Sequence, residues 1–245
     1  MFSFFRKKNN QFDFSAISTD LHSHLIPGID DGAPDMDTAI GLIRGLVDLG
    51  YKKIITTPHI FSDLYPNTPA IIESGYKEVM AEIERQELSV RFQAAAEYMM
   101  DDTFTRAIDK KESFLTLQDK LVLVELSFAV PAINLTEILF NLQINGYRPI
   151  LAHPERYLYF GANKAWYDQL KSSGCLFQLN LLSFAGYYGK GPQELAQYLI
   201  KKKYVDFLGT DLHHERHLEA LRTSSTIHNT ASKLLDGGMI RNASL

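Results

Sequence analysis

Seven short apolar segments recur along the 245-residue chain, and most stretches between them have the periodicity of a helix. The segments are residues 17–21, 53–57, 90–96, 120–126, 149–152, 176–181 and 205–209. Strands that alternate with helices predict a parallel sheet, because each connection must cross back over a face of the sheet. These strands are apolar along nearly their whole length, which is typical of strands buried on both faces.

Start and stop signals support the helices between these strands. Asp35 marks the start of a helix predicted over residues 36–49, and Gly50 marks its end. Within it, Ile40 and Ile43 fall on one face, as expected for an amphipathic helix packed on a sheet. Two further helices are predicted at residues 136–142 and from residue 191 towards residue 204.

Six of the segments end in residues whose side chains bind metal ions. These residues are Asp20, His22 and His24; His59; Glu97; Glu125; His153 and Glu155; and Asp211 and His213. In a (β/α) barrel the carboxyl ends of successive strands converge on one face. An open doubly wound sheet would gather ligands mainly at a switch point of strand order, and not from nearly every strand. The distribution therefore favours a closed barrel with a hydrolytic metal centre.

The spacing within two of these groups is informative. His22 and His24 are two residues apart on an extended segment, so their side chains point to the same side and can share an ion. Asp211 and His213 repeat this spacing near the other end of the chain, and the first and last strands of a closed barrel are neighbours. Asp20 is expected to orient one of the imidazoles from behind.

The acidic loop of residues 29–32 follows the first ligand pair directly. Asp31 in this loop is either a further metal ligand or part of a tight turn, which an Asp-Gly pair favours in any protein. The sequence itself leaves both interpretations open.

Charge and cysteine content narrow the functional classes. The net charge of −4 argues against a general nucleic-acid binder, whose surface is usually basic. The single cysteine, Cys175, excludes an intrachain disulfide and fits a reducing cytoplasm. A cysteine-based phosphatase needs an arginine six residues after its nucleophile. Leu181 stands six residues after Cys175, so this class of phosphatase is excluded.

The domain organisation follows from the absence of any linker-like stretch. We expect an N-terminal arm at residues 1–18 and a single domain at residues 19–245. No apolar run reaches the roughly 18 residues of a membrane-spanning helix, so no stable membrane insertion is expected.

Taken together, several motifs resemble the PHP (polymerase and histidinol phosphatase) superfamily. They are DLHSH at residues 20–24, IPGIDDG at 26–32, TTPH at 56–59, LAHPERY at 151–157 and TDLH at 210–213, with the two strand-end glutamates. Within the superfamily, the PGIDDGA loop and the residues around LAHPERY are similar to the CpsB/YwqE group of bacterial protein-tyrosine phosphatases. The resemblance covers most of the chain, from about residue 19 to residue 213.

The resemblance implies a distorted (β/α)7 TIM-like barrel, the PHP fold, with two or three divalent ions at the C-terminal ends of its strands. One ion would be held by His22, His24, Glu97 and Asp211, a second by Asp31, His59 and His213, and a third by Glu125 and His153 with Glu97 bridging. Manganese is the expected metal, and zinc or iron would also suit these ligands.

The resemblance also implies the substrate and two catalytic arginines. Arg156 and Arg216 would bind the phosphate of a phosphotyrosine protein, and the loop that carries Arg216 is shorter than is usual in the family. The expected substrate is the tyrosine-rich tail of a bacterial tyrosine autokinase that controls polysaccharide export. Two alternatives remain, a small-molecule phosphatase of the histidinol-phosphate type and a PHP-type nuclease, and the acidic net charge disfavours the nuclease.

Aromatic residues are frequent near the predicted strand ends. Some are expected to line a cleft for a phenyl group, although core or rim packing is the commoner role for any one aromatic residue. The residues are Phe61, Tyr65, Tyr157, Tyr159, Phe184, Tyr187 and Tyr188.

Overall fold

The computed structural model describes residues 12–245. This part of the chain contains nine β-strands, and all neighbouring strands that are hydrogen-bonded to each other run parallel. The strands are β1 (Thr19–Asp20), β2 (Lys53–Thr56), β3 (His59–Ile60), β4 (Arg91–Ala94), β5 (Glu97–Met99), β6 (Leu121–Glu125), β7 (Arg148–Ala152), β8 (Leu176–Asn180) and β9 (Phe207–Gly209). All seven predicted segments contribute strands, which confirms the parallel α/β class.

Two of the predicted strands are each followed by a second short strand that the sequence did not predict. The segment that begins at residues 53–57 forms β2 and then β3, with Pro58 between them, and the segment 90–96 forms β4 and continues into β5 after Ala95 and Ala96. Proline has no N–H to donate to a ladder, which suits a break at this point. The strands consequently divide into a sheet of order β1-β2-β4 and a sheet of order β3-β5-β6-β7-β8-β9.

The first and last strands lie side by side just beyond their ends. His24 N donates to Leu212 O at 2.9 Å, and Asp211 N donates to His22 O at 2.7 Å. Ser23 and Leu212 form an isolated parallel bridge. The first and last strands are therefore neighbours, as predicted for a closed barrel. The hydrogen bonds between strands, however, form two separate sheets and not one continuous barrel.

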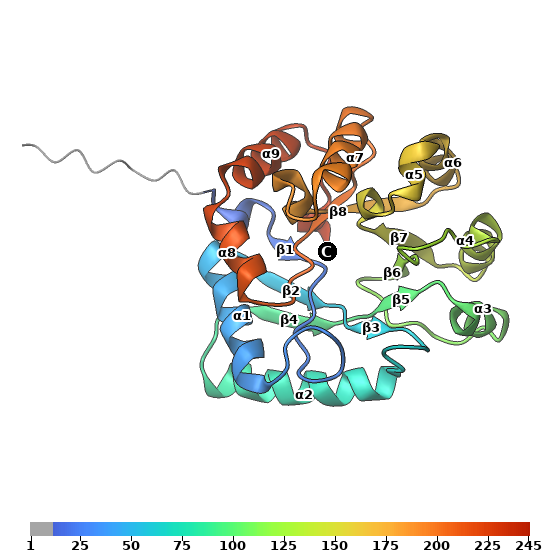
Figure 1. Cartoon of the computed structure of the whole chain (residues 1–245). Coiled ribbons are helices and arrows are strands. Elements are labelled where there is room, and N and C mark those ends of the chain that lie inside the picture. Colours follow the sequence, from blue (N-terminus) through green and yellow to red (C-terminus); the bar gives the residue numbers. More distant parts are fainter. Residues whose placement is uncertain (1–11) are drawn as a thin grey trace, which may run out of the picture.

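Helices surround the strands (Figure 1). They are α1 (Met36–Leu49), α2 (Pro69–Arg85), α3 (Asp102–Asp109), α4 (Leu135–Ile144), α5 (Tyr159–Ala162), α6 (Ala165–Ser172), α7 (Lys190–Lys201), α8 (Glu215–Thr223) and α9 (Ser225–Asp236), with short 3-10 turns η1 (Phe14–Ala16), η2 (Pro154–Arg156), η3 (Leu181–Ala185) and η4 (Asn242–Ser244). The predicted helix 36–49 is α1: Asp35 caps it by accepting from Thr38 N at 2.8 Å, and Gly50 ends it with φ of 113°.

The apolar core ends where the predicted metal-ligand residues begin. Leu121 and Leu123 of β6 pack with Ile150 and Phe207 in a buried cluster among the strands. Glu125 lies two residues beyond Leu123 on the same face of the strand, because side chains alternate along a strand. The same inward row that fills the core therefore delivers a carboxylate to the strand-end face.

The predicted N-terminal arm is only partly described, because residues 1–11 lie outside the described residues. Phe14 in the remaining part is fully buried. Its ring lies 5.5 Å from that of Tyr51 and 5.8 Å from that of His228, so this end of the arm packs on the domain. Among the described helices, none is both long and apolar enough to cross a membrane.

Candidate metal centre

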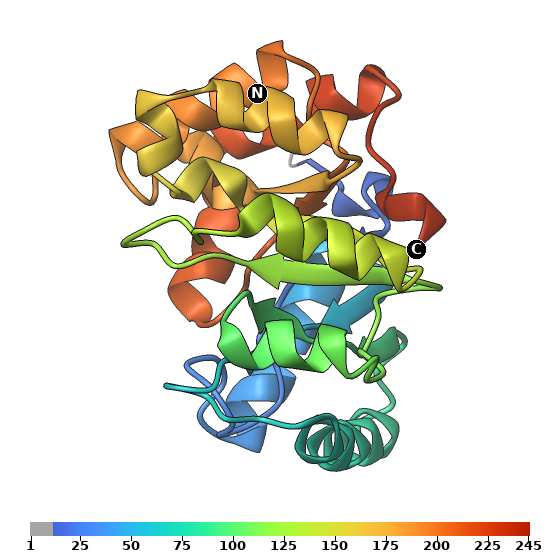
Figure 2. The ribbon, with the colours of Figure 1, turned by 90° about the vertical axis from the view of Figure 1, so that its right-hand side faces the viewer.

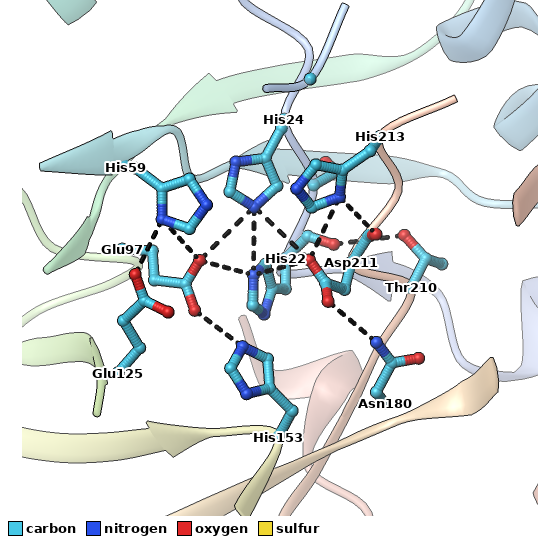
Figure 3. Close-up of polar contacts among 12 residues, drawn as sticks. His22, His24, His59, Glu97, Glu125, His153, Asn180, Thr210, Asp211 and His213 are labelled. Atoms are coloured by element: carbon cyan, nitrogen blue, oxygen red, sulfur yellow. Dashed lines mark hydrogen bonds and ion pairs between the residues drawn. The ribbon is translucent and has the colours of Figure 1, made fainter. Parts of the chain in front are cut away.

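All nine predicted metal ligands lie together in one cluster, and Figure 3 labels all of them except Asp31. They are His22 and His24 after β1, Asp31 in the next loop, His59 on β3, Glu97 on β5, Glu125 at the end of β6, His153 after β7, and Asp211 and His213 after β9. The sequence left open whether Asp31 is a ligand or part of a turn. Its Oδ1 lies 3.4 Å from His59 Nε2 and 3.5 Å from His213 Nε2.

Glu97 lies at the centre of this cluster and is fully buried. Its Oε2 is 3.0 Å from His22 Nε2 and 3.4 Å from both His24 Nε2 and His59 Nδ1, and its Oε1 is 3.0 Å from His153 Nε2. Burial opposes ionisation of this carboxyl, but the surrounding imidazoles hold its pKa well below the usual range. Contacts from both oxygens suit the predicted bridging role.

The orientation of three imidazoles is set by an oxygen acceptor at Nδ1. The pairs are His22 with Gln178 Oε1 at 2.8 Å, His24 with Asp30 Oδ2 at 2.9 Å, and His213 with the backbone oxygen of Asp211 at 2.9 Å. An acceptor at Nδ1 requires the ring proton there, so Nε2 of each neutral ring carries a lone pair. All three lone pairs face the cluster.

These lone pairs need positive charge between them. Nε2 of His22 and Nε2 of His24 lie 3.3 Å apart in a fully buried setting, where two lone pairs repel each other. Without a metal, extra ring protons must supply the charge: burial lowers the pKa of His24, but Asp30 and Asp211 raise it well above its usual value. Neutral imidazole and ionised carboxylate are also the donors that divalent transition metals prefer, so the residues fit such ions.

The donor atoms fall into four overlapping groups. Within each group they lie within 4.8 Å of one another: His24, Asp31, His59 and His213; His22, His24 and Asp211; His22, Glu97 and His153; and His59, Glu97 and Glu125. Glu125 thus has His59 as a partner, with 2.9 Å between Oε1 and Nδ1, where the resemblance paired it with His153. The division of the nine residues among individual ions stays a prediction.

Asp30 supports the cluster from behind and was not anticipated from the sequence. Its side chain is buried, and Oδ2 contacts His24 Nδ1 while accepting from the backbone N–H of His59 at 3.0 Å. Its Oδ1 accepts from Gly32 N at 3.0 Å. Of the two aspartates in this loop, only Asp31 was predicted from the sequence as a candidate ligand. Two adjacent aspartates on a turn usually point their side chains in different directions.

Asp20 does not have the predicted role of orienting an imidazole. It accepts hydrogen bonds from the backbone N and the Oγ1 of Thr210, both at 3.0 Å, and so ties β1 to the loop after β9. Burial raises the pKa of Asp20 to about 6. The prediction rested on Asp20 and His22 sharing one face of the strand. In the structure both oxygens of Asp20 are instead occupied by Thr210, just after β9.

Replacing Asp30 with asparagine should lower metal affinity by about 10- to 100-fold, the usual cost of disturbing a carboxylate behind a metal-bound histidine. The amide carries less negative charge at His24 Nδ1 and no longer favours the required tautomer. Metal titration of the stripped protein measures the effect. Asp37→Asn is the matched control, because Asp37 is exposed on α1. Equal affinity in the two variants would remove Asp30 from the site.

Arg156 borders the cluster on the 3-10 turn η2. Its Nη1 donates to Asp211 Oδ2 at 2.7 Å, and its side chain is 22% exposed. The guanidinium carbon lies 4.7 Å from the ring centre of Phe128 and 4.2 Å from that of Tyr188, so two aromatic rings pack against it. Asn180 Nδ2 also donates to Asp211 Oδ2, at 3.0 Å.

The structure does not bring Arg216 to the cluster. It is exposed in the first turn of α8, and no hydrogen bond or ion pair joins its side chain to the described residues. His217, one position further on, is buried instead, with Nδ1 3.1 Å from the backbone oxygen of Asp211. The predicted contact of Arg216 with phosphate therefore stays a prediction.

Fold and site together define a parallel α/β protein with a cluster of candidate metal ligands at its strand ends. The model of the CpsB/CapC family, described as capsular polysaccharide synthesis, matches residues 18–234, and the chain belongs to this family. This confirms the resemblance seen in the sequence motifs.

Relatives in the family are tyrosine phosphatases by name. The chain is 28% identical over 195 residues to tyrosine-protein phosphatase YwqE of Bacillus subtilis (strain 168), covering 79% of this chain and 76% of the relative. It is 23% identical over 199 residues to tyrosine-protein phosphatase CpsB of Streptococcus agalactiae serotype V, covering 79% and 82%.

Solved structures share the fold. One from a study of YwqE of Bacillus subtilis and CpsB of Streptococcus pneumoniae, described as unique metal-dependent tyrosine phosphatases, has a TM-score of 0.75 at 24% identity and covers 91% of this chain and 94% of its own. Histidinol phosphate phosphatase of Lactococcus lactis, complexed with zinc, L-histidinol and phosphate, has a TM-score of 0.53 at 15% identity, with coverage of 91% and 93%.

Proposed function

We propose that this protein is a metal-dependent phosphomonoester hydrolase that acts on protein phosphotyrosine. The observation that carries the proposal is the cluster of five histidines and four carboxylates at the strand ends, in which Nε2 of His22 and of His24 meets oxygens of Glu97 and Asp211, with Arg156 at the edge of the cluster. The names of its relatives support the choice of phosphotyrosine.

The nine clustered residues would hold two or three divalent ions, with manganese proposed and zinc or iron also suited to the donors. Such ions supply Lewis-acid chemistry, in which they polarise phosphate oxygens and lower the pKa of bound water. Three divalent ions would outweigh the charge of the four clustered carboxylates, so the site would attract a phosphate dianion although the protein is net acidic.

Cysteine chemistry is not required and is disfavoured by the position of the thiol. Cys175 is buried, and burial raises the pKa of its thiol to about 12, so it carries no thiolate at neutral pH. Arg156 would instead contribute by binding phosphate oxygens, because only one of its N–H groups is occupied by Asp211.

Arg156→Ala should lower kcat/KM on a phosphotyrosine peptide by about 10- to 150-fold, since a hydrogen bond to a charged group is worth about 1.5–3 kcal/mol. Arg156→Lys should recover only part of the loss, because an ammonium cannot reproduce the planar fork of donors. Steady-state kinetics, with the metal content of each variant checked, measures this.

Arg148→Ala is the matched control, because Arg148 is exposed at the beginning of β7 while Arg156 follows the end of the same strand. Its catalytic efficiency should equal that of the unmodified protein. A full rate in Arg156→Ala would exclude this arginine from substrate binding and weaken the phosphatase proposal.

The proposed physiological substrate is the tyrosine-rich tail of a bacterial tyrosine autokinase of polysaccharide export, encountered in the cytoplasm. The family's association with capsular polysaccharide synthesis supports this choice. Rates on a phosphotyrosine peptide and on histidinol phosphate, measured side by side with manganese present, test the substrate class. Faster turnover of histidinol phosphate would favour the small-molecule alternative.

A further inference from the structure

Building on the proposed function, we infer that Phe128 is a specificity-determining residue that receives the phenyl ring of an aryl phosphate. Its side chain forms the exposed aromatic wall of the site and favours phosphotyrosine over phosphate esters of alkyl alcohols. Phe128 lies in the loop between β6 and α4, three residues after Glu125. Figure 2 shows this loop projecting at the side of the molecule towards which β6 points.

Phe128 packs directly on the metal centre. Its ring lies 5.6 Å from that of His153 with an interplanar angle of 27°, and 4.7 Å from the guanidinium carbon of Arg156. The side chain nevertheless remains 50% exposed. One part of the ring is therefore fixed against a metal-ligand residue and the phosphate-binding arginine, while the rest is open to a ligand.

Two tyrosines hold the backbone that carries this ring. The hydroxyl of Tyr157 accepts from Leu126 N at 2.9 Å, and the hydroxyl of Tyr159 donates to Ser127 O at 3.0 Å. Tyr157 is fully buried, and its ring lies 5.5 Å from that of Phe128. Because the two residues before Phe128 are anchored in this way, its exposed ring has a preferred position and loses little conformational entropy when a ligand binds.

The geometry explains why an aromatic ester group would benefit. A phosphate bound to Arg156 would lie close to the two rings that pack on the guanidinium, so its ester group would be within reach of them. Tyr188, the second ring that packs on Arg156, is partly buried, and its hydroxyl accepts from Asn180 Nδ2 at 3.1 Å. Phe128 is the more exposed ring, and a phenyl group can stack on it or meet its edge, whereas a short alkyl chain offers no such face.

Tyr65 is the competing aromatic residue. Its ring stacks on His59 at 5.3 Å with an angle of 17°, so it also borders the cluster. It flanks His59, however, whereas Phe128 flanks Arg156 itself. A phenyl group bonded through oxygen to the phosphorus lies within reach of the arginine, which favours Phe128.

Inhibition by phenylphosphonate and butylphosphonate tests the role of Phe128 in binding. A phosphonate is not hydrolysed, so the result does not depend on how well an ester group leaves. Phe128→Ala should raise the inhibition constant of phenylphosphonate by about 3- to 10-fold, as expected for loss of one aromatic pair, and that of butylphosphonate by less than about 2-fold. Phe128→Trp should keep the preference for phenylphosphonate. Phe128→Leu, which preserves apolar packing on His153, should lose that preference while retaining its metal content.

Phe140→Ala is the control, because Phe140 is a 59% exposed aromatic residue on α4 outside the metal-ligand cluster, and its replacement should leave both constants unchanged. Equal changes for the two phosphonates in Phe128→Leu would overturn the inference, as would a larger selective loss in Tyr65→Ala. Metal loss in both the alanine and the leucine variants would also overturn it, since Phe128 would then only hold His153. If the unmodified protein did not hydrolyse phosphotyrosine, the proposed function would fail independently of Phe128.

Discussion

Glu97→Gln is expected to reduce turnover on a phosphotyrosine peptide by more than about 100-fold, beyond the range typical of changes behind the metal ligands. Glu97 contacts four histidines through its two oxygens, and an amide supplies one neutral acceptor and one donor instead. The NH2 group would face an imidazole nitrogen or an ion that requires a lone pair. Metal content should therefore fall together with the rate.

Kinetics and elemental analysis of the same preparation give the two readouts. Glu112→Gln is the control, because Glu112 is an exposed glutamate in the loop after α3 and lies outside the cluster. A variant that retained both full metal content and a near-normal rate would show that Glu97 is structural and would contradict the bridging assignment.

Removing the metals from the unmodified protein should abolish turnover and lower the melting temperature by about 5–10 °C. An ion present at about 100 times its dissociation constant stabilises the folded state by about 2.7 kcal/mol. For a domain of this size, 1 kcal/mol corresponds to roughly 2–4 °C. The direction follows from the cluster itself, because its buried carboxylates repel one another once the cations leave.

Calorimetry before and after treatment with a strong chelator measures the shift, and addition of manganese should reverse it. The Glu97→Gln protein should show a smaller shift under the same treatment, since it begins with less bound metal. An unchanged melting temperature together with full activity after complete metal removal would contradict a metal-dependent mechanism.

The fold class was accessible from the sequence because its signals are local. Apolar runs of strand length alternate with helical periodicity, and helix α1 has both its cap at Asp35 and its stop at Gly50 within a few residues of its ends. Pro58 was a local signal for the break after β2, but no local signal in the sequence indicated what this break does to the sheets. Only the pairing of β2 with β4 and of β3 with β5 divides the strands into two sheets.

The clustering of the candidate ligands was also accessible from the sequence, because the carboxyl ends of parallel strands must share one face. His22 and His24 carried the clearest signal in their two-residue spacing, and the nine predicted residues do lie together. The supporting residues were not accessible in this way. Gln178 reaches His22 from a strand 156 positions away, and nothing in the local sequence distinguishes it from a core glutamine.

The sequence by itself therefore determined the parallel α/β architecture and the identity of the residues that meet at the strand ends. The tertiary structure decided the imidazole tautomers, the ion pair of Arg156 with Asp211 and the exposure of Phe128 beside them. These properties depend on contacts between segments remote in sequence, and no periodicity or motif encodes such contacts. Phe128 shows the difference: in the sequence it is one apolar residue of a loop, and its position over Arg156 and His153 arises only when β6 and β7 lie side by side.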